Sequence, residues 1–173
     1  KLNKKAAYRS QFLHWPAEER KGFEALKERR RPNLKERVTL RWKELVKEYV
    51  GRDYSLTIGG YPCGFYGALR FLMGEERLLL NFYDDPVLVR DFMNTLADFW
   101  IELWGQALSE IRVDCVSFWE DMAYRSGPFI SPQMFKEFML PPYKRITSFL
   151  NEMGVKVILV DTDGNIEKLI PLF

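Results

Sequence analysis

Residues 113–121 read VDCVSFWED, an apolar run that ends abruptly in two carboxylates. Residues 155–163 read VKVILVDTD and repeat this design, because a nearly continuous apolar run again ends in acids. Between the two runs, Ser131 and Pro132 form a pair typical of a helix start, and helical spacing continues to Gly154. A strand, a helix and a second strand in this order predict a parallel βαβ unit, whose strands are neighbours and are buried on both faces.

The flanking segments extend the alternation of helices and strands. The short β-prone run at 54–58 is closed by two glycines and predicts another strand. Helical spacing predicts one helix near 65–73 and a long helix over 85–110. Within the helix that Ser131 starts, Pro141 and Pro142 are expected to cause a break or a kink.

We therefore expect one partial α/β domain over residues 1–173, with a helical segment at 1–53 and three βα units at 54–173. In the helical segment, helices are predicted to start at Pro16 and near Asn33. A doubly wound sheet and a (β/α)8 barrel both agree with this order of elements. No GxGxxG or Walker-type loop follows any of the predicted strands, so the usual signatures of nucleotide binding are missing.

The composition is that of an ordinary globular protein, with 47% hydrophobic and 29% charged residues. A formal net charge of +2 gives no support to a nucleic-acid partner. No apolar stretch approaches the ~20 residues that span a bilayer, and no secretory signal is evident. Cys63 and Cys115 match no metal spacing and fit a reducing compartment, so a cytoplasmic location is expected. The aromatic content of 15% calls for a large core or for a homodimer interface that covers some rings.

Polar side chains follow the predicted strands at the point where each strand ends. Glu120 and Asp121 follow one apolar run, and Asp161 and Asp163 follow the next. Parallel strands end at the same edge of a sheet, so these acids are expected to converge on one pocket, where crowding raises at least one pKa. The alternative is that each acid caps the next segment or pairs with a neighbour such as Arg125.

The lone histidine, His14, precedes every predicted strand, so we expect it to be structural or exposed. Nucleophilic sites built on histidine, and zinc sites that contain it, therefore find no support.

Three segments carry a family resemblance: FWEDMA at 118–123, GPFISPQMF at 127–135 and LPPYK at 140–144. In order and spacing they resemble the middle of the barrel in the uroporphyrinogen decarboxylase superfamily. The resemblance is good over 84–173, weaker over 54–83 and thin before that. It implies a (β/α)8 TIM barrel, which typically needs ~250 residues, so only part of a barrel is expected in this chain.

Two departures from the family pattern limit what the resemblance implies. The arginine-rich motif with which the decarboxylases grip substrate carboxylates is not found. Asp161 and Asp163 occupy the positions of the His and Cys ligands in the zinc-dependent methyltransferases, so zinc is not expected. A hard metal, or no metal with Asp163 acting on the substrate, both remain open.

The resemblance implies an enzyme that acts on, or together with, a tetrapyrrole or a methylated small molecule. Methyl transfer involving a corrinoid protein is the first expectation, since the motifs resemble the methyltransferase-like branch. Cofactor-free uroporphyrinogen decarboxylation in porphyrin biosynthesis, and a barrel that only binds, are the alternatives. The expected catalytic residues are Glu120, Asp121 and Asp163, and the expected substrate-binding residues are Tyr61, Tyr66, Arg70, Tyr124 and Asp161. An open sheet with uncovered apolar side chains is also expected to be poorly soluble or to self-associate.

Overall fold

The computed structural model describes residues 14–29 and 41–173. Their elements, in chain order, are α1 (Arg20–Arg29), α3 (Trp42–Val50), β1 (Thr57–Gly59), α4 (Tyr66–Met73), α5 (Glu75–Asp84), α6 (Pro86–Leu108), β2 (Cys115–Trp119), β3 (Ala123–Tyr124), β4 (Gly127–Pro128), α7 (Pro132–Met134), a π-helical turn (Phe135–Met139), α8 (Leu140–Glu152), β5 (Val157–Asp161) and a final 3-10 turn (Ile170–Leu172). None of the helices in these two ranges has the length and apolar character needed to cross a membrane.

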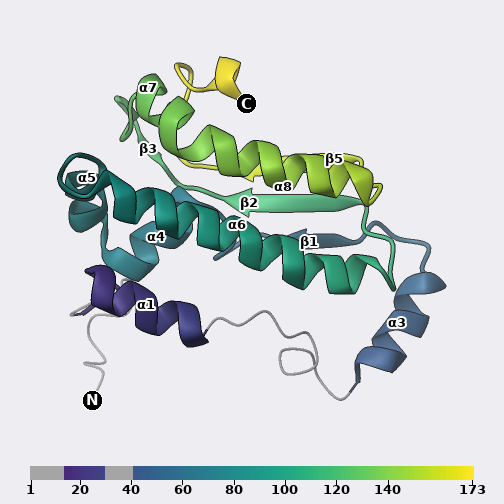
Figure 1. The fold of residues 1–173 in the computed structure, drawn as a ribbon. Coiled ribbons are helices and arrows are strands. Elements are labelled where there is room, and N and C mark those ends of the chain that lie inside the picture. The colour runs from purple at the N-terminus through teal and green to yellow at the C-terminus, as the bar shows by residue number, and fades with distance from the viewer. Residues whose placement is uncertain (1–13, 30–40) are drawn as a thin grey trace, which may run out of the picture.

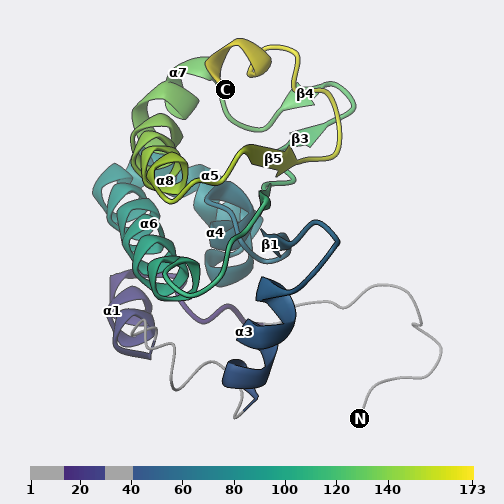
Figure 2. The same cartoon turned by 90° about the vertical axis from the view of Figure 1, so that its right-hand side faces the viewer.

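The main sheet has three parallel strands in the order β1-β2-β5. Cys115 is paired with Thr57 of β1 on one side and with Val157 of β5 on the other. The predicted parallel pairing of the runs at 113–119 and 155–160 is therefore confirmed. Helices α6 and α8 lie side by side on one face of this sheet (Figures 1 and 2).

Side chains of β2 alternate between the two faces of the sheet. Val116 and Phe118 point to the helices and are fully buried, and Phe118 contacts Trp104 of α6 and Tyr143 of α8. Ser117 and Trp119 point to the opposite face and are half-buried, and the Trp119 ring packs against Gly67 and Phe71 of α4. The face away from α6 and α8 is therefore the more open side of the sheet, with α4 over the end of β2.

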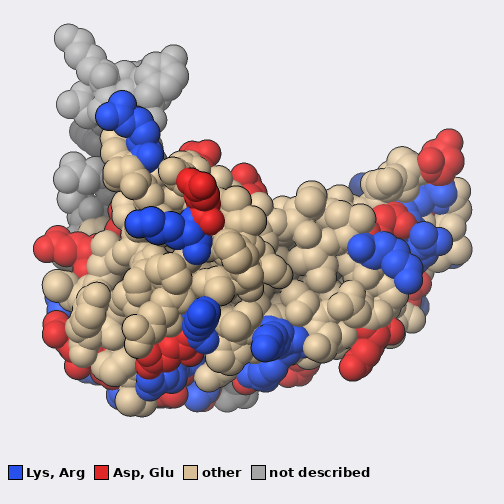
Figure 3. Space-filling view, turned by 90° about the horizontal axis from the view of Figure 1, so that it is seen from above, with Lys and Arg blue, Asp and Glu red and all other residues tan. Residues whose placement is uncertain are grey.

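The expectation that both strands are buried on both faces is wrong for β5. Val157 is 47% and Leu159 is 51% exposed, because they lie on the face of the sheet away from α6 and α8. Viewed from above, the molecule shows a broad uncharged surface, with charged groups toward its two ends and along one side (Figure 3). Within the described residues β5 also pairs only with β2, so its other edge is open.

This open strand leads to a first prediction. The chain is expected to self-associate at micromolar concentration, because an unpaired strand edge with exposed apolar side chains favours pairing between copies. A charge placed at the exposed Leu159 opposes such contacts, so Leu159→Lys should shift the sedimentation profile toward monomer. Val50→Lys, which alters an exposed apolar residue on α3 away from the sheet edge, is the control and should not. A wild-type chain that sediments as a monomer at every concentration would contradict the prediction.

The helix that starts at Ser131 contains the predicted irregularity. The Ser131 hydroxyl accepts a hydrogen bond from the Met134 N–H, as an N-cap does. Pro141 and Pro142 have no N–H groups to continue the α-helical ladder, and the preceding turn, Phe135–Met139, widens to π-helical geometry. Helix α8 then continues and brings Tyr143 over the end of β2.

Several element boundaries differ from the prediction. Helix α1 begins at Arg20 and not at Pro16, and the start predicted near Asn33 lies outside the described residues. Helix α5 was not predicted, since Gly74 looks like the end of a helix and not the turn between two. The short antiparallel pair β3–β4 was also missed, because two-residue strands leave no periodic pattern.

Candidate functional site

The loops that follow β2 and β5 lie against one another at the carboxyl edge of the sheet. The Glu120 N–H donates to the Asp161 carbonyl at 2.8 Å, and the Met122 N–H donates to the Thr162 hydroxyl at 3.0 Å. Farther out, the Asn165 N–H donates to the Tyr124 carbonyl at 3.0 Å. These hydrogen bonds fix the position of the loop after β2 relative to the loop after β5.

An open pocket of about 890 Å³ lies over this edge. Its walls come from α4, α5, the β3–β4 hairpin and the loop after β5. They comprise Arg70, Glu75, Asp121, Ala123, Tyr124, Arg125, Phe129, Asp163, Gly164 and Asn165. Asp121 and Asp163, which follow different strands, thus meet at the same pocket.

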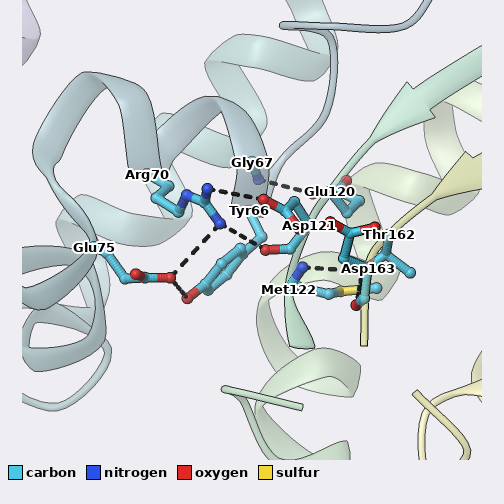
Figure 4. A network of polar contacts seen from close by, with 9 residues as sticks. All are labelled: Tyr66, Gly67, Arg70, Glu75, Glu120, Asp121, Met122, Thr162 and Asp163. Atoms are coloured by element: carbon cyan, nitrogen blue, oxygen red, sulfur yellow. Dashed lines mark hydrogen bonds and ion pairs between the residues drawn. The ribbon is translucent and has the colours of Figure 1, made fainter. Parts of the chain in front are cut away.

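Asp121 is held in an unusual backbone conformation by Arg70 (Figure 4). Its φ of 45° lies in the left-handed region, which costs a residue other than glycine about 1–2 kcal/mol. One Arg70 nitrogen lies 2.8 Å from the Asp121 carboxylate, and the other donates to the Asp121 carbonyl at 2.9 Å. Both side chains are about three-quarters buried, so this two-point contact is stronger than a surface ion pair.

Glu75 and Tyr66 complete the network around Arg70. The Glu75 carboxylate lies 3.7 Å from the Arg70 guanidinium and accepts a hydrogen bond from the Tyr66 hydroxyl at 3.4 Å. Burial raises the pKa of Tyr66 above its ordinary value, so its hydroxyl stays protonated and acts as a donor. Arg70 is therefore contacted by two carboxylates.

The aromatic rings beside Arg70 form a further support on the open side of the sheet. The guanidinium carbon lies 5.5 Å from the Trp119 ring centroid and 6.0 Å from that of Phe71. Tyr61 packs edge-on against both rings, with centroids 5.1 and 5.2 Å away. Tyr61 is 63% exposed and does not line the pocket, so its expected place at the substrate is not what the structure shows.

Glu120 points away from the pocket and into the helix layer, where it is fully buried. Its carboxylate accepts hydrogen bonds from the Phe65 N–H at 2.8 Å, from the Gly67 N–H at 3.0 Å and from the Tyr143 hydroxyl. Helix α4 reaches it because Gly67 has no side chain: a Cβ there would lie 2.4 Å from the Trp119 carbonyl oxygen. The carboxylate thus joins β2, the start of α4 and α8.

The expectation that four acids converge on one pocket is therefore corrected. Glu120 follows the helix-facing register of Val116 and Phe118, and Asp161 is exposed outside the pocket. The pKa of Glu120 is raised, but by burial in the core and not by crowding with other carboxylates. The hydrogen bonds that Glu120 accepts lower its pKa, because they stabilise the charged form, but the effect of burial is larger.

The raised pKa of Glu120 predicts a pH dependence of stability. The folded chain holds this proton more firmly than the unfolded chain, so the free energy of unfolding should fall as pH rises from the ordinary glutamate pKa through the raised one. Urea denaturation of the wild type and of Glu120→Gln over a pH series measures this, since glutamine does not titrate. The stability of the wild type relative to the variant should decline with rising pH. A constant difference would show that Glu120 does not titrate over the range.

The remaining expected site residues are divided between the pocket and its support. Arg70 and Tyr124 line the pocket, whereas Tyr66 is buried beneath it. Sequence reasoning missed Glu75 and Phe129 as pocket residues, and no local signal marks either, because α5 and the β3–β4 hairpin bring them there. Tyr143 fits the apolar spacing of a helix, and nothing else in the sequence marks it. Its contact with Glu120 joins segments that lie far apart in the chain.

The described residues contain no group of three His, Cys, Asp or Glu side chains placed to hold a metal ion. Asp163 lines the pocket and Asp161 does not. Asp161 and Asp163 occupy the positions of the family's zinc ligands. They therefore do not lie together in one site, because only Asp163 lines the pocket.

Parallel strands with helices on one face, and with carboxylates and arginines at the carboxyl edge, form an α/β arrangement that agrees with part of a (β/α)8 barrel. The sequence profile of the uroporphyrinogen decarboxylase (URO-D) family matches residues 13–170, nearly the whole chain. The chain therefore belongs to this family, whose members have a TIM-barrel-like fold and are generally enzymes. Neither the curated proteins nor the solved structures provided a match.

Proposed function

We propose that this chain carries a substrate-binding edge of a tetrapyrrole-linked enzyme, and that its reaction is methyl transfer involving a corrinoid protein. The observation that carries the choice is the charge of the pocket. Three carboxylates (Glu75, Asp121 and Asp163) and two arginines line it. Arg70 already contacts two of those carboxylates, so little positive charge is left for an anionic substrate.

This charge balance favours a corrinoid over a porphyrinogen. A porphyrinogen carries acetate and propionate carboxylates, which would be placed next to Asp121 and Asp163. Like charges brought together at a binding surface cost several kcal/mol. The amide side chains of a corrinoid are neutral and can hydrogen-bond to carboxylates without this cost.

Within the chain, two of the three pocket carboxylates have distinct parts in the proposed reaction. The corrinoid of the partner protein would supply the methyl group as a CH₃⁺ equivalent, and the electron pair of the broken Co–C bond would stay with the corrinoid. Asp121, held by Arg70, would accept the proton that a methyl acceptor releases when its X–H group becomes X–CH₃. Asp163, on the opposite loop, would orient that acceptor.

One observation bears on a binding-only alternative. Glu120 points into the helix layer, as it would in a barrel that had lost its chemistry. Asp121 and Asp163 line the pocket, which supports retention of a reactive site.

Direct binding and turnover distinguish these functions. The chain is titrated with hydroxocobalamin and, separately, with uroporphyrin, and the visible spectra give both dissociation constants. The corrinoid is expected to bind at least about tenfold more tightly. Turnover is then tested with methylcobalamin plus a thiol and with uroporphyrinogen. Release of CO₂ from uroporphyrinogen would establish the decarboxylase instead, and corrinoid binding without any methyl transfer would establish a binding protein.

A pair of isosteric variants tests the pocket assignment. Asp163→Asn is expected to lower turnover about 100-fold, because loss of the group that orients the methyl acceptor typically costs about that much. Its melting temperature should change little, because removal of one of three pocket carboxylates relieves repulsion. Asp161→Asn removes the same charge two residues away, outside the pocket, and is the control. Equal turnover in the two variants would remove Asp163 from the site.

A further inference from the structure

A second pocket, of about 810 Å³, adjoins the candidate site. The two pockets share Glu75 and Phe129 as lining residues, so they are adjacent; together they are called the trough, and its lining extends from Asp163 to Trp15. Trp15 lies against the turn between α4 and α5, where only a glycine leaves room. A Cβ at Gly74 would lie 2.9 Å from the indole ring, and the φ of 87° at Gly74 also suits glycine.

The second pocket combines apolar and aromatic walls with an excess of negative charge. Trp15, Phe129, Leu79 and Leu80 supply apolar surface. Leu80 is 52% and Phe129 is 37% exposed, so this surface is open to a ligand.

Its charged lining consists of three carboxylates, Glu18, Glu75 and Glu76, and one arginine, Arg77. The Glu18 carboxylate accepts a hydrogen bond from the backbone N–H of Trp15 at 3.0 Å, and the Glu75 carboxylate contacts Arg70. Glu76 is exposed and has no hydrogen-bond or ion-pair partner among the described residues. A carboxylate beside aromatic rings in an apolar pocket thus remains available to a ligand.

We propose that the second pocket binds an organic cation with apolar substituents, of the class of N-methylated ammonium compounds. The rings of Trp15 and Phe129 line this pocket, where aromatic rings attract such a cation through their quadrupoles, and the apolar walls accept its methyl groups. The carboxylates supply the opposite charge, and an anion would meet their repulsion. This is a second site, and its test does not depend on the reaction proposed above.

Calorimetric titration of the chain compares three probes, the first two of which have the same size and shape. Choline carries the cation, 3,3-dimethylbutan-1-ol is its neutral isostere, and acetate represents an anion. Choline is expected to bind about tenfold more tightly than the neutral isostere, and acetate should not compete. Equal binding of choline and the isostere, or competition by acetate, would overturn the proposal.

Two variants locate the choline site within the trough. Phe129→Leu keeps apolar volume but removes the ring, and Glu76→Gln removes only charge; each should weaken choline binding about threefold to tenfold. Tyr83→Leu removes an aromatic ring and Glu152→Gln removes a carboxylate charge at exposed positions outside the trough. Both variants should leave choline binding unchanged. Glu76 is exposed, so its variant is expected to fold even if Phe129→Leu does not. Choline affinity that is unchanged in Glu76→Gln would exclude this pocket as the site.

Discussion

Replacement of Glu120 by alanine is expected to lower the free energy of unfolding by on the order of 4 kcal/mol, because two backbone N–H groups lose their buried acceptor at about 1–3 kcal/mol each. The donors are those of Phe65 and Gly67 at the start of α4, and the Tyr143 hydroxyl loses its partner as well. The substitution also leaves a cavity among fully buried side chains. A loss of this size would be a large part of the stability of an ordinary domain.

Urea denaturation of the wild type and the variant measures this effect. Glu137→Ala is the matched control: it removes a glutamate that pairs with Arg90 at the surface, where an ion pair is worth at most about 1 kcal/mol. Tyr143→Phe removes a single donor to Glu120, so its effect should be smaller than that of Glu120→Ala. A loss below about 1 kcal/mol for Glu120→Ala would show that Glu120 does not join β2, α4 and α8 as the structure indicates.

Asp121→Asn is expected to reduce turnover about 100- to 1,000-fold while the fold is kept. Asparagine tolerates a positive φ better than most residues, so the left-handed backbone of Asp121 can persist without the carboxylate. Arg70 loses its ionic contact but retains its hydrogen bond to the backbone carbonyl. The loss should therefore appear mainly in turnover, with a smaller decrease in the melting temperature from the lost ion pair.

The measurement is kcat/KM for whichever of the methyl-transfer and decarboxylation reactions the wild type performs. Asp84→Asn, an exposed change at the end of α5, is the control for loss of one negative charge. Arg70→Lys keeps the positive charge but cannot make the two-point contact, and it should give an intermediate loss. If Asp121→Asn turns over at the wild-type rate, the Arg70–Asp121 pair is structural only.

The parallel strands and the polar ends that follow them were predictable from the sequence because both are local features. Apolar runs at 113–119 and 155–160 indicated neighbouring strands, and the Ser131-Pro132 pair located a helix start. The acids that follow such strands necessarily lie near one edge of the sheet. The family resemblance rested on the same local segments, and the match over residues 13–170 agrees with it.

The direction of each acid was decided by tertiary structure. The β2 run is apolar on both faces, so no alternation in the sequence shows which face meets the helices, and Glu120 and Asp121 are indistinguishable there. Contacts with Phe65 and Tyr143 take Glu120 into the core, and Arg70 holds Asp121 at the pocket.

The pocket and its adjoining trough depend in the same way on segments that meet only in the folded chain. Glu75 arrives on α5, which Gly74 hid because it looks like the end of a helix, and Phe129 follows the β3–β4 hairpin, whose two-residue strands leave no periodic pattern. Local sequence thus determined the strands, most of the helices and the polar loop residues, because hydrogen-bonding and apolar periodicity act between near neighbours. Only the tertiary structure decided which carboxylate is buried, which one faces a ligand and which rings stand beside it, because packing between distant segments selects the face on which each side chain lies.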